Sequence, residues 1–214
     1  MRILFFLSLF YLSACNQNEP VAQVPKVSQQ SKTTYTILAL GDSLTEGLGV
    51  DEKDNYPSQL QDLLPTSIKV INAGLSGETS SGLLNRLDWV LKQKPDLTIL
   101  NIGANDAMRG LPLDLTAQNI DEILSTIEKS GSSVILAGMQ MYANLGEDYV
   151  NEFKNMYPKL AQKHGIELIP FFLQHIAGNP KFNQQDGIHP TADGYKIIVE
   201  KNILPFVLTH LENL

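Results

Sequence analysis

Cysteine is almost absent from this chain, because Cys15 is the only one in 214 residues. A single thiol allows neither an intrachain disulfide nor a zinc site built from several cysteines. The four histidines also lack the short spacing of zinc motifs such as His-Glu-x-x-His. The sequence therefore predicts no bound metal and no cofactor.

Positive charge is also scarce, with 16 Lys and Arg against 23 Asp and Glu and a net charge of −7. An acidic domain repels the phosphate backbone of nucleic acids. The sequence also contains no stripe of basic residues with interleaved aromatic residues that could bind nucleic acid. We therefore expect no nucleic-acid partner. The hydrophobic fraction of 43% is ordinary for a globular chain with a sizeable core.

The N-terminus has the features of a secretory targeting signal. Arg2 precedes the apolar run from Ile3 to Leu12, which is too short for the roughly 20 residues that span a bilayer but suits a secretory signal. The following Leu-Ser-Ala-Cys resembles the bacterial lipobox, with Cys15 as the lipidated residue. We predict a signal peptide over 1–14, an anchor and flexible tether over 15–34, and one folded domain over 35–214. A plain signal peptide with a chance cysteine is the alternative.

Lipidation of Cys15 would attach the domain to a membrane through acyl chains, at the periplasmic or extracytoplasmic face of the cell envelope. Asn16, in place of an aspartate, favours the outer membrane where the cell has one. We expect the domain itself to be a monomer.

Short apolar runs alternate with helical patterns along the rest of the chain. Runs that are apolar on both faces are typical of buried parallel strands, and five occur, at 35–40, 68–71, 97–101, 134–137 and 167–169. Between them, apolar residues recur at helical spacing, for example at Ile120, Ile123, Leu124 and Ile127. The alternation predicts a three-layer α/β/α domain with a five-stranded parallel sheet of the flavodoxin-like type.

Prolines mark two helices of this pattern. Pro158 lies inside a predicted helix around 150–160 and should kink it, because proline removes a backbone donor. Pro205 should kink or restart the last helix, which carries Tyr195, Ile198 and Val199.

Polar and glycine-rich segments follow the first three predicted strands, and a fourth lies near the C-terminus. They are Gly-Asp-Ser-Leu at 41–44, Asn-Ala-Gly-Leu-Ser-Gly-Glu at 72–78, Gly-Ala-Asn-Asp at 103–106 and Asp-Gly-Ile-His-Pro at 186–190. Ligands of open parallel sheets bind at the carboxyl ends of strands, so these segments are candidates for one site.

These four blocks, in this order, resemble the SGNH (GDSL) hydrolase superfamily, and most closely the bacterial thioesterase I/arylesterase/lysophospholipase group. The resemblance covers about residues 35–210. It implies an SGNH hydrolase fold and a serine nucleophile at Ser43. His189 would act as general base, and Asp186 would orient it, as in other triads. The chain lacks the Gly-x-Ser-x-Gly elbow of α/β-hydrolases, which makes that fold the weaker match.

The resemblance also implies three oxyanion donors: the backbone N–H groups of Ser43 and Gly77 and the side-chain amide of Asn105. Asp42 and Asp106, in the same blocks, are expected to hold the site loops by hydrogen bonds.

Two loops where the group usually has its substrate contacts supply four candidate substrate-binding residues: Met108, Leu111, Tyr142 and Leu145. Tyr142-Ala143 stands where a proline-containing sequence is common in this group.

The predicted activity is hydrolysis of aryl or fatty-acyl esters, with thioesters and lysophospholipids as further candidate substrates. Related SGNH folds also remove acetyl groups from carbohydrates, so a carbohydrate O-deacetylase is an alternative. A lipoprotein that binds ligands but lost catalysis is a second alternative, although the complete set of site residues argues against it.

Overall fold

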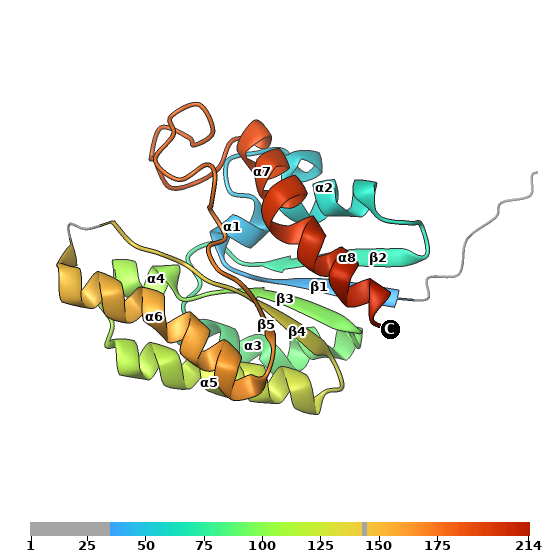
Figure 1. The fold of residues 1–214 in the computed structure, drawn as a ribbon, viewed down its shortest axis with the longest axis horizontal. Coiled ribbons are helices and arrows are strands. Elements are labelled where there is room, and N and C mark those ends of the chain that lie inside the picture. The colour runs from blue at the N-terminus through green and yellow to red at the C-terminus, as the bar shows by residue number, and fades with distance from the viewer. Residues whose placement is uncertain (1–34, 143–144) are drawn as a thin grey trace, which may run out of the picture. The chain divides into compact units, whose positions relative to one another are not determined.

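The computed structural model describes residues 35–142 and 145–214, so the predicted signal peptide, Cys15 and the tether lie outside the described residues. Its centre is a five-stranded parallel sheet in the order β2-β1-β3-β4-β5 (Figure 1). This is the flavodoxin-like order of doubly wound sheets. The fold class and all five predicted strands are confirmed, with the bounds β1 Tyr35–Gly41, β2 Ile68–Gly74, β3 Leu97–Asn101, β4 Ser133–Ala137 and β5 Glu167–Ile169.

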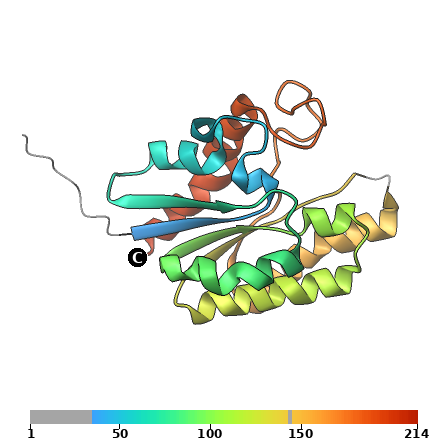
Figure 2. The ribbon, with the colours of Figure 1, turned by 180° about the vertical axis from the view of Figure 1, so that it is seen from behind.

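Helices cover both faces of the sheet (Figures 1 and 2). One layer contains α1 (Ser43–Glu46), α2 (Tyr56–Leu63), α7 (Ala192–Ile198) and α8 (Leu204–Glu212). The other contains α3 (Ser80–Val90), α4 (Ala104–Met108), α5 (Leu113–Lys129) and α6 (Glu147–His164). Short helical turns, η1 (Glu52–Asp54), η2 (Leu91–Gln93) and η4 (Val199–Ile203), complete the described elements.

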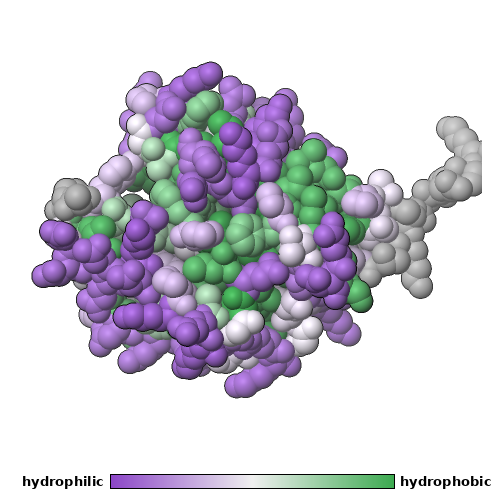
Figure 3. All heavy atoms as spheres, in the orientation of Figure 1, coloured by the Kyte–Doolittle hydropathy of each residue, from purple (hydrophilic) through white to green (hydrophobic). Residues whose placement is uncertain are grey.

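The core lies between the sheet and these two layers. Central strands β1 and β3 are apolar on both faces because both faces are covered, and Ile37 to Leu40 are fully buried. The helical stripe predicted on α5 is also fully buried, at Ile120, Ile123, Leu124 and Ile127. The outer surfaces of α5 and α6 are polar in Figure 3, whereas apolar side chains gather around α8. Among the described residues, no helix is long and apolar enough to cross a membrane.

The two prolines have different effects. Helix α6 continues through Pro158 from Glu147 to His164, so the proline does not end it. Helix α8 restarts with Pro205 in its first turn, after the π-helical turn η4. A first-turn proline loses no helical hydrogen bond, so the restart predicted at Pro205 is found.

Strand register places the chemistry-bearing loops together. Gly41 at the end of β1 pairs with Gly74 of β2 on one side and with Asn101 of β3 on the other. The three strands therefore end at the same edge, and the loops that follow them rise from adjacent points.

Candidate active site

Ser43 is the first residue of α1, directly after β1. The preceding Asp42 caps this helix, because its side chain accepts a hydrogen bond from the Leu44 N–H at 3.0 Å. The turn into the helix requires glycine at position 41, where an added Cβ would lie 2.2 Å from the Asn101 carbonyl oxygen. These local contacts fix the Ser43 side chain at the carboxyl edge of the sheet, 8% exposed.

The segment between β5 and α7 carries His189 and brings it to Ser43. The His189 Nε2 atom lies 2.9 Å from Ser43 Oγ, although the two residues are 146 positions apart in the chain. On the other side of the ring, Nδ1 lies 2.6 Å from Asp186 Oδ2. A proton on Nδ1 that is donated to the carboxylate leaves Nε2 free to accept the Ser43 hydroxyl proton.

Asp186 is held by its own loop as well as by the imidazole. Its Oδ1 accepts the backbone N–H of Ile188 at 2.8 Å and that of His189 at 3.0 Å. Partial burial alone would raise the pKa of Asp186, but the hydrogen bonds from the His189 ring and from the two N–H groups lower it to about 2. Asp186 is therefore a carboxylate at any pH near neutrality.

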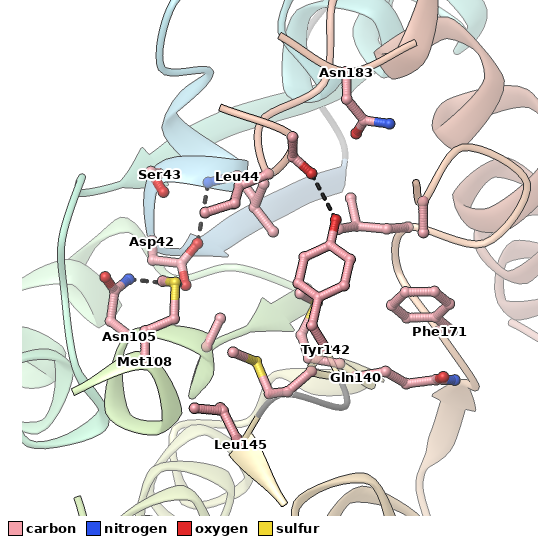
Figure 4. Close-up of a pocket in the computed structure, with 17 residues that line it drawn as sticks. Asp42, Ser43, Leu44, Asn105, Met108, Gln140, Tyr142, Leu145, Phe171 and Asn183 are labelled. Atoms are coloured by element: carbon pink, nitrogen blue, oxygen red, sulfur yellow. Dashed lines mark hydrogen bonds between the residues drawn. The ribbon is translucent and has the colours of Figure 1, made fainter. Parts of the chain in front are cut away.

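Asn105 lies on α4, after β3, and its side chain is paired with the residue before Ser43. Its Nδ2 donates to Asp42 Oδ2 at 3.3 Å (Figure 4), and because an amide carries two N–H groups, one remains for a ligand. Desolvation in this buried position is the main cause that raises the pKa of Asp42 to about 7. Asp42 thus links the Ser43 turn to the Asn105 helix, in line with the structural role expected for it.

Gly77 lies between β2 and α3 with a φ of +75°, which favours glycine. Its carbonyl accepts a hydrogen bond from Arg109 Nη2 at 2.6 Å, so the loop after Asn105 holds the loop of Gly77. Within the described part of the chain, no acceptor is found for the Gly77 N–H. Gly77 is not among the residues that line the cavity beside Ser43. Arg109, which holds the Gly77 loop, was not among the predicted site residues.

Asp106 fixes the same two loops from inside the protein. It is 1% exposed, and its carboxylate accepts the Ser80 N–H at 2.9 Å and the Ser80 hydroxyl at 2.6 Å. The start of α3 is thereby tied to α4, beside Asn105. These bonds agree with the expectation that Asp106 holds the site loops.

A mostly apolar cavity of about 430 Å³ opens beside Ser43 and Asn105 (Figure 4). That volume is within the usual range for small-molecule sites. Three of the four predicted substrate-binding residues line it: Met108, Tyr142 and Leu145. Leu111 does not line this cavity, because it lies in the loop before α5, where its carbonyl accepts a hydrogen bond from Tyr149 at 3.3 Å.

Part of the cavity lining comes from a segment that was not predicted. Phe171, Leu173 and Ala177 follow β5 and face the cavity together with Met139. The sequence held a usable signal, because Phe171 lies two residues after the end of the predicted strand 167–169. Residues at the carboxyl ends of all parallel strands are candidates for ligand contact. The described residues contain no group of three or more His, Cys, Asp or Glu placed to hold a metal ion.

The doubly wound sheet and the hydrogen-bonded series Ser43, His189 and Asp186 at its carboxyl edge define the class of this protein as a serine hydrolase. The chain belongs to the GDSL-like lipase/acylhydrolase family, whose family model matches residues 39–197. It is therefore an SGNH hydrolase, as the four sequence blocks predicted.

Known relatives agree with this assignment. The chain is 35% identical to an arylesterase of Vibrio mimicus over 178 residues, which cover 81% of this chain and 89% of the relative. It is also 35% identical to thioesterase 1/protease 1/lysophospholipase L1 of Escherichia coli K12, with 80% and 85% coverage. A solved structure of the psychrotrophic esterase EstA from Pseudoalteromonas sp., inhibited by monoethylphosphonate, superposes with a TM-score of 0.77 at 29% identity, covering 84% of this chain and 99% of that chain.

Proposed function

We propose that this protein hydrolyses carboxylic esters through an acyl-enzyme on Ser43. The observation that carries the proposal is the 2.9 Å contact between Ser43 Oγ and His189 Nε2, supported by Asp186 at 2.6 Å from the other ring nitrogen. A serine hydroxyl is a weak nucleophile unless a base lies within hydrogen-bonding distance, and this geometry supplies one.

The reaction has two steps. Ser43 Oγ attacks the ester carbonyl while His189 Nε2 accepts its proton, and the imidazole then gives that proton to the departing alcohol or thiol. In the second step His189 Nε2 takes a proton from water while the water oxygen attacks the acyl-enzyme carbonyl. The imidazole then returns that proton to Ser43 Oγ as the bond between Oγ and the acyl carbon breaks and the acid is released. Asp186 keeps the imidazole in the orientation and tautomer that both transfers need.

The negative oxygen of the tetrahedral intermediate requires donors that are already in place. We assign this role to the backbone N–H groups of Ser43 and Gly77 and to the second N–H of Asn105 Nδ2. The bond from Asn105 to Asp42 supports the assignment, because it fixes the amide before any substrate arrives.

We expect Asn105→Ala to lower kcat by about 10²–10³, the scale for removing one oxyanion donor. KM for p-nitrophenyl butanoate, the substrate of this assay, should change little, because the lost bond forms mainly in the transition state. Asn151→Ala is a matched control, since Asn151 is an exposed residue of α6 that does not line the cavity. A variant at Asn105 with wild-type kcat would remove this residue from the oxyanion site.

Aryl or fatty-acyl esters are the substrates that we propose, with thioesters and lysophospholipids as further candidates. The apolar cavity beside Ser43 is larger than an acetyl group needs. This favours esters of acyl groups longer than acetyl over the alternative substrate class, acetylated carbohydrates. A series of p-nitrophenyl esters from acetyl to dodecanoyl tests the choice. Activity confined to acetyl esters, with hydrolysis of acetylated glycans, would overturn it.

We also propose that Cys15 carries a lipid that anchors the domain at the periplasmic or extracytoplasmic face of a membrane in the cell envelope. The lipobox-like Leu-Ser-Ala-Cys supports this proposal. We expect the full-length protein to sediment with membranes and to need detergent for release, whereas Cys15→Ser should appear in the soluble fraction. Equal sedimentation of the two proteins would contradict the anchor.

A further inference from the structure

Tyr142 connects the two sides of the cavity. It comes from the loop between β4 and α6, and its hydroxyl donates a hydrogen bond to the Gly187 carbonyl at 2.8 Å (Figure 4). Gly187 belongs to the loop that carries Asp186 and His189. The tyrosine side chain therefore reaches from one cavity wall to the catalytic loop.

Tyr142 lines the same cavity as Ser43 and Phe171. In the view of Figure 4 it is drawn between these two residues. Leu173 and Ala177, from the same segment as Phe171, also line the cavity. An acyl chain that extends from Ser43 toward these apolar residues would therefore pass close to the tyrosine ring.

We propose that Tyr142 is a specificity-determining residue that limits the length of acyl chain that the cavity accepts while the tyrosine ring stays in place. This inference rests on the proposed ester hydrolysis at Ser43. Acyl chains that stop before the ring bind without disturbance, whereas longer chains reach the surface of Phe171 only when the bond to Gly187 breaks. Tyr142 is 56% exposed, so the residue is not packed tightly on all sides and the ring can turn toward solvent once that bond is lost.

The test compares two variants on p-nitrophenyl butanoate and p-nitrophenyl decanoate, with the ratio of kcat/KM for decanoate over butanoate as the readout. Tyr142→Phe keeps the ring and removes its anchor, so the ratio should rise about three- to tenfold, the scale of one hydrogen bond. Tyr142→Ala removes the ring, and each further buried methylene is worth about a factor of four. Two newly buried methylenes would therefore raise the ratio about fifteenfold, mainly through a lower KM for decanoate.

Tyr35→Phe is the matched control, because it removes a tyrosine hydroxyl that contacts His210. Its ratio should equal that of the wild type. A ratio that is unchanged or lower in both Tyr142 variants would overturn the inference, since a purely structural role would slow both esters equally. Fluorophosphonate labelling of Ser43 in the wild type tests the proposed function separately. A labelled enzyme whose ratio does not change at Tyr142 therefore refutes only this inference.

Discussion

We expect Ser43→Ala to lower kcat for p-nitrophenyl butanoate by about 10⁴–10⁶, the scale of nucleophile knockouts in other serine hydrolases. The alanine has no hydroxyl to place 2.9 Å from His189 Nε2, so no acyl-enzyme can form. The oxyanion donors and the cavity remain, and a small residual rate above that of water should persist. Steady-state kinetics measure the loss of kcat. Covalent labelling by a fluorophosphonate independently measures the loss of the nucleophile.

The matched control is Ser130→Ala, which removes a hydroxyl that bonds only the Ile127 carbonyl at the end of α5. That variant should keep wild-type kinetics and should still be labelled. If Ser43→Ala keeps full activity or is still labelled at the active site, Ser43 is not the nucleophile and the proposed mechanism fails.

A loss of about 10⁴ in kcat is expected for Asp186→Asn, as for the equivalent change in other triads. The asparagine has nearly the same shape, but its amide can present N–H groups to His189 Nδ1 and so favour the wrong tautomer. KM should change little, because Asp186 does not line the cavity. The variant should therefore fold and bind substrate normally while the proton transfer fails.

The low pKa of Asp186 excludes this carboxylate as the cause of an activity loss at mildly acidic pH. Because the pKa is lowered to about 2, the group is mostly ionised at pH values above it and mostly protonated at pH values below it. A loss of activity between pH 7 and pH 4 in the wild type therefore does not report on Asp186. A pH–rate profile of kcat/KM is the measurement.

Asp96→Asn is the control for loss of a carboxylate, since Asp96 accepts the Thr36 N–H at 2.7 Å near the start of β1. Its kinetics should match those of the wild type. An Asp186→Asn enzyme with less than a tenfold change in kcat would show that the carboxylate does not orient the catalytic imidazole.

Predictions from the sequence were weakest at the cavity walls. Leu111 was expected there because related enzymes usually have a substrate loop at this place, yet it does not line the cavity, and its carbonyl accepts a hydrogen bond from Tyr149. Phe171 was not expected, because the segment after β5 carries no polar motif. Lining residues depend on how loops fold back over the sheet, and neither periodicity nor motif spacing encodes that path.

The sequence alone determined the strands, their alternation with helices and the four polar blocks, because burial on both faces of a sheet leaves a local pattern. It also named Ser43, Asp186 and His189 as candidates. Only the tertiary structure decided that Ser43 and His189 come within 2.9 Å, that Asp42 holds Asn105, and that Tyr142 spans the cavity to Gly187. Those contacts join residues far apart in the chain, and sheet register together with loop packing sets their distances.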